Sequence, residues 1–438
     1  MSAFGHRSSL RARFQAGIFW NAIAAVAAQG TTFLANLVVA NLLGRDGFGE
    51  FSIVYTTVLA AAGIAQVATG VTATKYVAEF RDLEKDRAGR VLGLCSLVSL
   101  AGGAGATLLI ISSASWLAGR VLSAPHVVNE LSVAAGFVLF SAANGYQQGA
   151  LAGFEAYRNL ARVSIAAGIV HVASVVVGTY WWDLTGAVTG VVVSAAVRWL
   201  LFNVALRAEA ERRGIAIRYR NALGERTIVH RFAVPAAIAG LSTMPAVWLA
   251  NVFLAQQPGG YGQVGLFTAA NNLKNLVLFL PALTNNVGQA LLNSQKGHRD
   301  QARYTKVFWA NTGATATLLI TASAAMAIFG KLLLGLYGAT FDEAYPILMV
   351  LLVAAVMEGM ATATYQVVQT QERMWASLFG IALPRDLLLI GGAYFLAARH
   401  GGLGLATAFA LAAAGGLVAT VVAVRHIGLS VSAPKSAR

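Results

Sequence analysis

Apolar stretches of about 20 residues recur from one end of this chain to the other, and they constrain its fold more than any other feature. A helix needs about 20 apolar residues to cross a hydrocarbon core of roughly 30 Å. Of the 438 residues, 57% are hydrophobic and 11% are charged, against roughly 25% charged in a soluble domain. The sequence therefore predicts an all-α polytopic membrane protein with about 12 transmembrane helices. The stretches lie near residues 16–43, 51–73, 91–111, 131–153, 161–180, 186–206, 228–255, 264–292, 307–330, 344–367, 375–397 and 402–424.

The net charge of +14 is distributed unevenly between the predicted sides of the membrane. If the N-terminus is cytoplasmic, 25 of the 32 Lys and Arg residues lie in the tails and loops on that side. Four lie on the opposite side, namely Arg45, Arg120, Lys331 and Arg399. This asymmetry follows the positive-inside rule and predicts that both termini are cytoplasmic. The basic charge therefore indicates orientation in a bilayer, and no nucleic-acid partner is expected.

The two halves of the chain resemble each other. Three pairs of segments match in the same order at offsets of 218, 215 and 216 residues: RFQAGIFW with RFAVPAAI, LANLVVA with LANVFLA, and GEFS with GLFT. Six spans per half give both halves the same orientation, an arrangement found in transporters. We predict an N-terminal six-helix lobe at 1–206, a basic cytoplasmic loop at 207–227 and a C-terminal six-helix lobe at 228–438.

Five ionisable residues fall near the middle of predicted spans: Arg198, Lys274, Glu358, Arg385 and Asp386. Charges at such depth are costly, usually face protein or water, and often mark a substrate path. Three positive and two negative charges favour an anionic ligand. Because successive helical residues do not face each other, we expect Arg385 to face the substrate. Asp386 is expected to pair with Lys274 or to titrate with a coupling proton, and Glu358 is a second ion-coupling or charge-balancing candidate.

Polar residues form stripes on the predicted spans and indicate a wet interior. Amide side chains suit sugar hydroxyls because each carries donors and acceptors, although the same residues can simply bond neighbouring helices. His171, near Ser164 on the fifth span, is interpreted as a hydrogen-bonded packing residue rather than a proton relay. The predicted cavity lining comprises Asn21, Gln29 and Asn36 in the first span, and Asn271, Asn272, Asn275, Asn286 and Gln289 in the eighth.

Several stretches give the chain a resemblance to a known family. They are LLGRDGFGEFSIVYTTV, KYVAEFRDLEKDRAGRV, VGLFTAANNLKNLVLFLPALTNNVGQALLNSQKG and FDEAYPILMVLLVAAVMEGMATATYQVVQTQERMW. With the twelve-span layout, they resemble Wzx-type oligosaccharide flippases, in the polysaccharide-transporter branch of the multidrug/oligosaccharidyl-lipid/polysaccharide (MOP) exporter superfamily.

This resemblance implies a MATE-like fold that carries a polyprenyl-diphosphate-linked oligosaccharide across the prokaryotic inner membrane by alternating access. Arg198, Lys274 and Arg385 would then hold the diphosphate. A polysaccharide polymerase and a chain-length protein would be its partners.

Two other functional classes stay open. A multidrug or cation exporter of the same superfamily would be expected to hold unpaired carboxylates in its cavity, and Glu358 and Asp386 keep that class in consideration. A membrane-embedded glycosyltransferase or polymerase would need a sizeable outer loop with catalytic acids, whereas Asp46 and Asp183 lie in short loops. No phosphate-cradling loop with its lysine is present. We expect a transporter with no metal and no cofactor.

Overall fold

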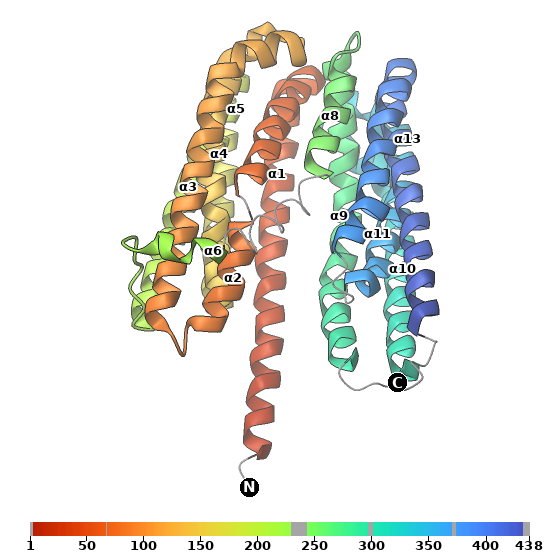
Figure 1. The fold of residues 1–438 in the computed structure, drawn as a ribbon. Helices are drawn as coiled ribbons and strands as arrows, with labels where there is room; N and C mark the ends of the chain where they lie inside the picture. Colours follow the sequence, from red (N-terminus) through yellow and green to blue (C-terminus); the bar gives the residue numbers. More distant parts are fainter. Residues whose placement is uncertain (1–2, 67, 229–242, 297–300, 370–373, 432–438) are drawn as a thin grey trace. The chain divides into compact units, whose positions relative to one another are not determined.

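The computed structural model describes residues 3–66, 68–228, 243–296, 301–369 and 374–431. Its larger helices are shown in Figure 1. The α-helices are α1 (Ala3–Ala65), α2 (Thr69–Phe80), α3 (Lys85–Trp116), α4 (Val128–Gly153), α5 (Tyr157–Arg212), α6 (Arg226–Ile228), α8 (Thr243–Ala255), α9 (Gly260–Lys296), α10 (Gln301–Gly335), α11 (Tyr345–Gln369), α12 (Met374–Ser377) and α13 (Leu383–Val431). Short π- and 3₁₀-helical turns are η1 (Leu117–Val121), η2 (Pro125–Val127), η3 (Ala222–Glu225), η5 (Ala339–Ala344) and η6 (Leu378–Ala382).

Three of the long helices contain one break each. α1 breaks at Gly44, α5 at Trp182 and Asp183, and α13 at Gly401. Over the described ranges, these three supply six helical segments, and α3, α4, α8, α9, α10 and α11 supply six more. Each segment overlaps one predicted span, and seven of the continuous runs are long and apolar enough to cross a membrane. The predicted all-α polytopic membrane fold is confirmed.

The backbone repeats a feature between the two halves of the chain. Positive φ angles occur at Gly44 and Gly259, at Ser123 and Gly338, and at Asp183 and Gly401. The members of these pairs are 215, 215 and 218 residues apart, close to the offsets of the matching sequence segments. Positive φ is uncommon outside glycine and turns the chain sharply. The internal repeat therefore extends from sequence to the positions at which the helices end.

The chain divides into two compact units. Unit 1 comprises Met1–Leu43 and Val54–Leu241, and unit 2 comprises Gly44–Ile53 and Ser242–Arg438. The segment Gly44–Ile53 thus belongs to unit 2, although its neighbours on both sides in the chain belong to unit 1. The predicted lobes at 1–206 and 228–438 place Gly44–Ile53 in the N-terminal lobe and do not anticipate this exchanged segment. The lobe boundaries at 206 and 228 stay a prediction.

Within unit 1, small residues let helices approach closely. A Cβ atom added at Gly149 in α4 would overlap the carbonyl of Gly70 in α2. Large apolar side chains such as Leu108 and Ile169 are about two-thirds exposed, at 66% and 63%. Close packing of small residues and outward apolar side chains are the pattern of helices that associate in lipid.

The exchanged segment packs closely inside unit 2. A Cβ atom at Gly49 would overlap the carbonyl of Tyr261, and one at Gly265 would overlap the carbonyl of Arg45. Gly49 and Gly265 are also matched by the sequence repeat, as GEFS and GLFT. Arg45 Nη1 forms an ion pair with Glu343 at 2.9 Å. The repeat-related helices therefore cross at equivalent glycines.

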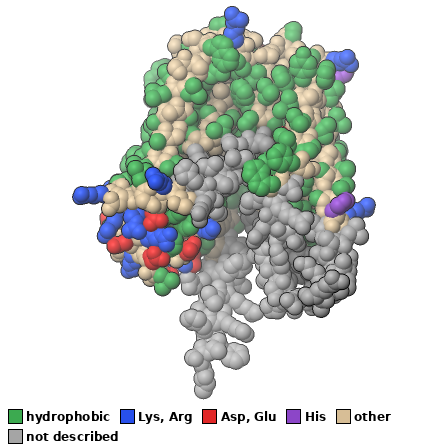
Figure 2. All heavy atoms as spheres, in the orientation of Figure 1, with side chains coloured by type: hydrophobic (Ala, Val, Ile, Leu, Met, Phe, Trp, Pro, Cys, Tyr) green, Lys and Arg blue, Asp and Glu red, His purple; other side chains and the backbone are tan. Residues whose placement is uncertain are grey.

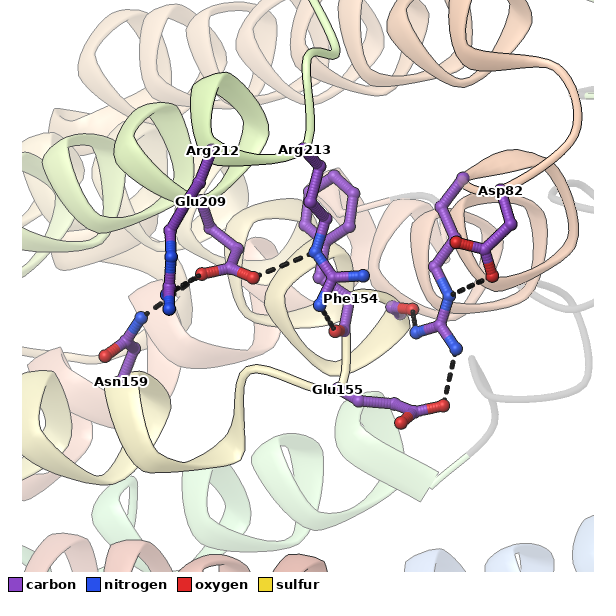
Figure 3. A network of polar contacts seen from close by, with 9 residues as sticks. Asp82, Phe154, Glu155, Asn159, Glu209, Arg212 and Arg213 are labelled. Atoms are coloured by element: carbon purple, nitrogen blue, oxygen red, sulfur yellow. Dashed lines mark hydrogen bonds and ion pairs between the residues drawn. The ribbon is translucent and has the colours of Figure 1, made fainter. Parts of the chain in front are cut away.

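The C-terminal end of α4 is held by two arginines that directly follow α2 and α5 (Figure 3). Arg81 Nη1 donates to the carbonyl of Gly153 at 2.7 Å, and Arg213 Nη2 donates to the carbonyl of Phe154. The last carbonyls of a helix lack intrahelical partners and carry partial negative charge, so cations stabilise them. This contact ties the ends of α2, α4 and α5 together.

Carboxylates in turn hold both arginines (Figure 3). Arg213 Nε donates to Glu209 at 2.9 Å, and Arg81 Nη2 donates to Glu155. Burial acts to lower the pKa of Arg81, but the hydrogen bond and charge of Glu155, together with Asp82, outweigh it and raise the pKa above its ordinary value. Arg81 is therefore permanently charged.

The basic segment after α5 packs against α3. The backbone amide of Arg218 donates to the carbonyl of Gly89 at 3.0 Å, and Arg90 Nη2 forms an ion pair with Glu225 at 3.1 Å. Figure 2 shows basic and acidic side chains gathered at this end of unit 1, with hydrophobic side chains over much of the remaining described surface. The segment thus contacts α3 through its backbone and Glu225, while basic side chains such as Arg218 and Arg220 are exposed.

Candidate functional site

A polar cavity of about 430 Å³ lies inside unit 1. Both arms of α1 line it, together with α4 and both arms of α5. The breaks at Gly44 and at Asp183 return each helix antiparallel to itself, so that polar residues far apart in sequence face one space. Its polar side chains are Thr31, Thr32, Tyr55, Gln66, Ser141, Asn144, Gln148, Ser164, His171, Ser194 and Arg198.

Among the described residues that line this cavity, Arg198 is the permanent cation, and it has no ion pair or hydrogen bond to the described part of the chain. Its Nε atom is buried without a hydrogen-bond partner. The guanidinium carbon lies 5.8 Å from the centre of the Phe202 ring. Since an unpaired cation in a protein interior is costly, this arrangement suits an anion that enters the cavity.

His171 connects the two arms of α5 beside this arginine. Its Nδ1 atom lies 2.9 Å from Ser194 Oγ, and Ser194 Oγ donates to the carbonyl of Val191 at 2.8 Å. The predicted packing role of His171 is thus present. The ring also lines the cavity.

Amides and hydroxyls line the remaining polar wall. Gln148 Nε2 donates to Asn144 Oδ1 at 2.8 Å, and both residues come from α4. Thr31 and Thr32 each donate to a carbonyl one turn earlier in α1. Hydroxyl oxygens used in this way still accept hydrogen bonds. The wall can therefore both accept and donate hydrogen bonds.

In unit 2, Lys274 forms an ion pair with Glu358. Its Nζ atom lies 3.1 Å from Glu358 Oε2 and 5.5 Å from the centre of the Phe409 ring. The lysine side chain is 5% exposed and the glutamate side chain 46% exposed. Lys274 therefore pairs with Glu358 rather than with Asp386, and the predicted Lys274–Asp386 pair is wrong.

Arg385 and Asp386 pair with each other, contrary to the sequence-based expectation. Arg385 Nη2 lies 2.7 Å and Nε 2.9 Å from Asp386 Oδ1, and Nη2 also donates to Thr243. Adjacent residues on a helix point about 100° apart at Cβ. The guanidinium group stands on a long flexible stem, so it reaches around the helix to the short aspartate. The direction of Cβ alone does not include this reach.

The remaining predicted lining residues do not gather at the unit 1 cavity. Gln29 and Asn36 are half-buried and Asn21 is exposed, and none of the three lines it. Asn271, Asn272 and Asn275 are half-buried in α9 of unit 2. Asn286 and Gln289 have side chains outside the described part of the chain.

Sequence reasoning missed most of the wall of the cavity. Tyr55, Asn144, Gln148 and Ser194 line it and were not singled out. The fourth predicted span carried a signal for this wall. Its run ANGYQQG contains three amide side chains within five consecutive residues, inside an otherwise apolar stretch. Polar clusters are expensive in that setting, so this run could have been weighted as heavily as the charged residues.

A family model described as "Polysaccharide biosynthesis protein" matches residues 14–287, more than half of the chain. The chain belongs to this polysaccharide biosynthesis protein family. The match includes every residue of the unit 1 cavity and Lys274, whereas Glu358, Arg385 and Asp386 lie beyond it.

Two curated proteins are similar to this chain over most of its length. Both are named "EPS I polysaccharide export inner membrane protein EpsE", one from Ralstonia nicotianae and one from Ralstonia solanacearum. Each is 25% identical, over 387 and 395 residues respectively, and each alignment covers 86% of this chain and 85% of the relative. The predicted polysaccharide branch of the superfamily is confirmed.

Solved structures of MOP superfamily transporters share the fold. An inward-facing multidrug resistance MATE family transporter has a TM-score of 0.78 at 16% identity, covering 95% of this chain and all of the other. A MOP superfamily transporter from Pyrococcus furiosus, described as having a binding pocket of reverse polarity, has a TM-score of 0.71 at 18% identity, with 96% of each chain covered. At this identity the likeness concerns the fold alone, and it confirms the predicted MATE-like architecture.

Proposed function

We propose that this protein is a polysaccharide exporter of the prokaryotic inner membrane, a transporter rather than an enzyme. Specifically, it would move a polyprenyl-diphosphate-linked oligosaccharide from the inner to the outer leaflet by alternating access. The family match and two relatives named as export inner membrane proteins support the coarse function. The MOP fold supports a transport mechanism.

The observation that carries the finer proposal is the unpaired Arg198 in a polar cavity. Guanidinium groups form bidentate, charge-assisted hydrogen bonds with phosphate, and the amides and hydroxyls around it match sugar hydroxyls. One wall therefore offers chemistry for both the diphosphate and the first sugars.

Lys274 and Arg385 take a secondary place in this proposal. Each is bonded to a carboxylate, so it would have to exchange that carboxylate for a phosphate. Glu358 and Asp386 then act as charge-balancing groups. The same pairing weakens the cation-exporter alternative, because neither carboxylate is unpaired.

Native mass spectrometry of co-purifying lipids tests the proposed substrate class. We expect a polyprenyl diphosphate carrying sugars to co-purify with the wild-type protein, since the cavity offers an unpaired cation. An Arg198→Gln variant of equal abundance is expected to retain at least tenfold less of it. Recovery of bulk phospholipid only, from a host that makes the lipid-linked glycan, would contradict the proposal.

We further propose that both termini face the cytoplasm, on the basis of the 25 to 4 distribution of Lys and Arg. Single cysteines replacing the exposed residues Arg220 and Lys331 test this. A membrane-impermeant thiol reagent applied to intact cells is expected to label position 331 and not position 220. Cys95 is buried and serves as the unlabelled background. Labelling at position 220 alone would invert the orientation.

A further inference from the structure

Arg198 and His171 share the wall of the unit 1 cavity, and only the arginine is charged at every physiological pH. We propose that His171 is a second, pH-dependent ligand of the anionic group that Arg198 recognises, so that diphosphate binding takes up one proton on the histidine. This inference rests on the proposed function and adds a regulatory feature to the same site.

The hydrogen bonds around His171 determine which ring nitrogen carries the proton. Ser194 has one hydroxyl hydrogen, and it donates that hydrogen to the carbonyl of Val191. With the hydroxyl hydrogen directed to Val191, the contact between Ser194 Oγ and His171 Nδ1 has Nδ1–H as its donor. In the neutral ring, Nε2 is then a bare acceptor.

The Nε2 atom has no hydrogen-bond partner in the described part of the chain, and the ring that carries it lines the cavity. A lone pair at Nε2 repels a phosphate oxygen, whereas a protonated ring presents Nε2–H as a charge-assisted donor. Only the imidazolium form can therefore hold the anion.

The charges around the cavity couple protonation to the ligand. Among the lining residues, the titratable or charged side chains are Tyr55 on α1, His171 on the first arm of α5, and Arg198 on its second arm; α4 contributes uncharged groups. None of the described residues that line the cavity is a carboxylate. In the empty cavity, the charge of Arg198 opposes a second positive charge on His171, and a diphosphate removes that opposition.

Binding measurements on the purified protein at about pH 6 and pH 8 test the coupling. The probe is a short-chain prenyl-diphosphate-linked sugar, a diester whose phosphates do not titrate in this range. If binding takes up one proton on His171, the affinity of the wild-type protein falls as the pH rises. The fall is up to about tenfold per pH unit in the range where His171 is neutral in the unliganded protein.

Two variants separate this role from mere packing. His171→Gln keeps a neutral donor at all pH values, so its binding is expected to be independent of pH. Ser194→Ala frees the ring to carry its neutral proton on Nε2, which should strengthen binding at pH 8 and flatten the dependence while the histidine remains. As a control, His126→Gln changes an exposed histidine of unit 1 outside the cavity and should keep the wild-type slope.

The outcomes distinguish the two proposals. Equal wild-type affinity at both pH values, or an unchanged slope in His171→Gln, overturns the role of His171 and leaves the proposed function intact. Absence of probe binding at either pH overturns the diphosphate recognition on which both rest.

Discussion

Arg198→Glu is expected to abolish glycan export in a flippase-deficient strain while leaving the amount of folded protein unchanged. The glutamate places a negative charge where the diphosphate would bind, inside a cavity whose described lining residues include no other permanent cation. Arg198→Gln removes charge-assisted hydrogen bonds of about 1.5–3 kcal/mol, so export should fall roughly 10- to 100-fold at subsaturating substrate. Arg198→Lys should lie between Gln and wild type, because lysine keeps the charge but not the bidentate geometry.

Arg162→Gln and Arg162→Glu provide the matched controls, since Arg162 is an exposed arginine of the same helix outside the cavity. Both should export glycan at near wild-type levels. Folding is not expected to suffer in Arg198→Gln, because removing an unpaired arginine strands no carboxylate. Arg198→Glu exchanges one unpaired charge in the polar cavity for another, so the abundance of that variant is measured beside the wild type. Export by Arg198→Glu at half the wild-type level or more, at equal expression, would remove Arg198 from the substrate site.

Arg385→Gln is expected to destabilise unit 2 more than Asp386→Asn does, and the double variant should recover most of the loss. The Asp386 side chain is 4% exposed and the Arg385 side chain 34%. Removing the arginine leaves a buried carboxylate whose remaining hydrogen bond, among the described residues, comes from Thr243 Oγ1 at 3.5 Å. Breaking a fully buried pair from one side costs about 3–5 kcal/mol. Because Arg385 is one-third exposed, we expect about 1–3 kcal/mol here.

Thermal unfolding in detergent and glycan export, measured on the same variants, separate a structural pair from a substrate ligand. If the pair is structural, the double variant exports glycan well although it lacks Arg385. A double variant that is stable yet as inactive as Arg385→Gln would return Arg385 to the diphosphate site. Arg45→Gln is the control, since its pair with Glu343 is 40% and 63% exposed and exposed pairs contribute about 0–1 kcal/mol.

Local sequence was sufficient to predict the transmembrane helices, because the bilayer imposes the same simple requirement on each of them. About 20 apolar residues in a row must form a helix that satisfies its own backbone groups in lipid. The span near 161–180 and the next near 186–206 could therefore be predicted separately, although α5 joins them across the break at Asp183. The repeat was also readable, since GEFS and GLFT lie 216 residues apart and their glycines meet in unit 2.

The sequence identified the charged residues as candidate substrate ligands, but it did not predict which of them form ion pairs with each other. Sequence places Arg198, Lys274 and Arg385 at similar depth in their spans and makes them look equivalent. Which of them keeps a free charge depends on what each side chain can reach, and that is a matter of helix rotation and stem length. Arg385 folds back onto its own neighbour, an outcome that Cβ directions alone do not reveal.

The sequence by itself determined that this is a helical membrane protein with two related halves and a basic cytoplasmic side as its predicted orientation, because hydropathy, periodicity and charge are properties of continuous segments. The tertiary structure alone decided that Gly44–Ile53 belongs to unit 2 and that Arg198 faces a polar cavity with His171. Both depend on close contacts between helices distant in the chain, which small residues such as Gly49 and Gly149 permit. Such contacts arise from three-dimensional packing, and no single stretch of sequence encodes them.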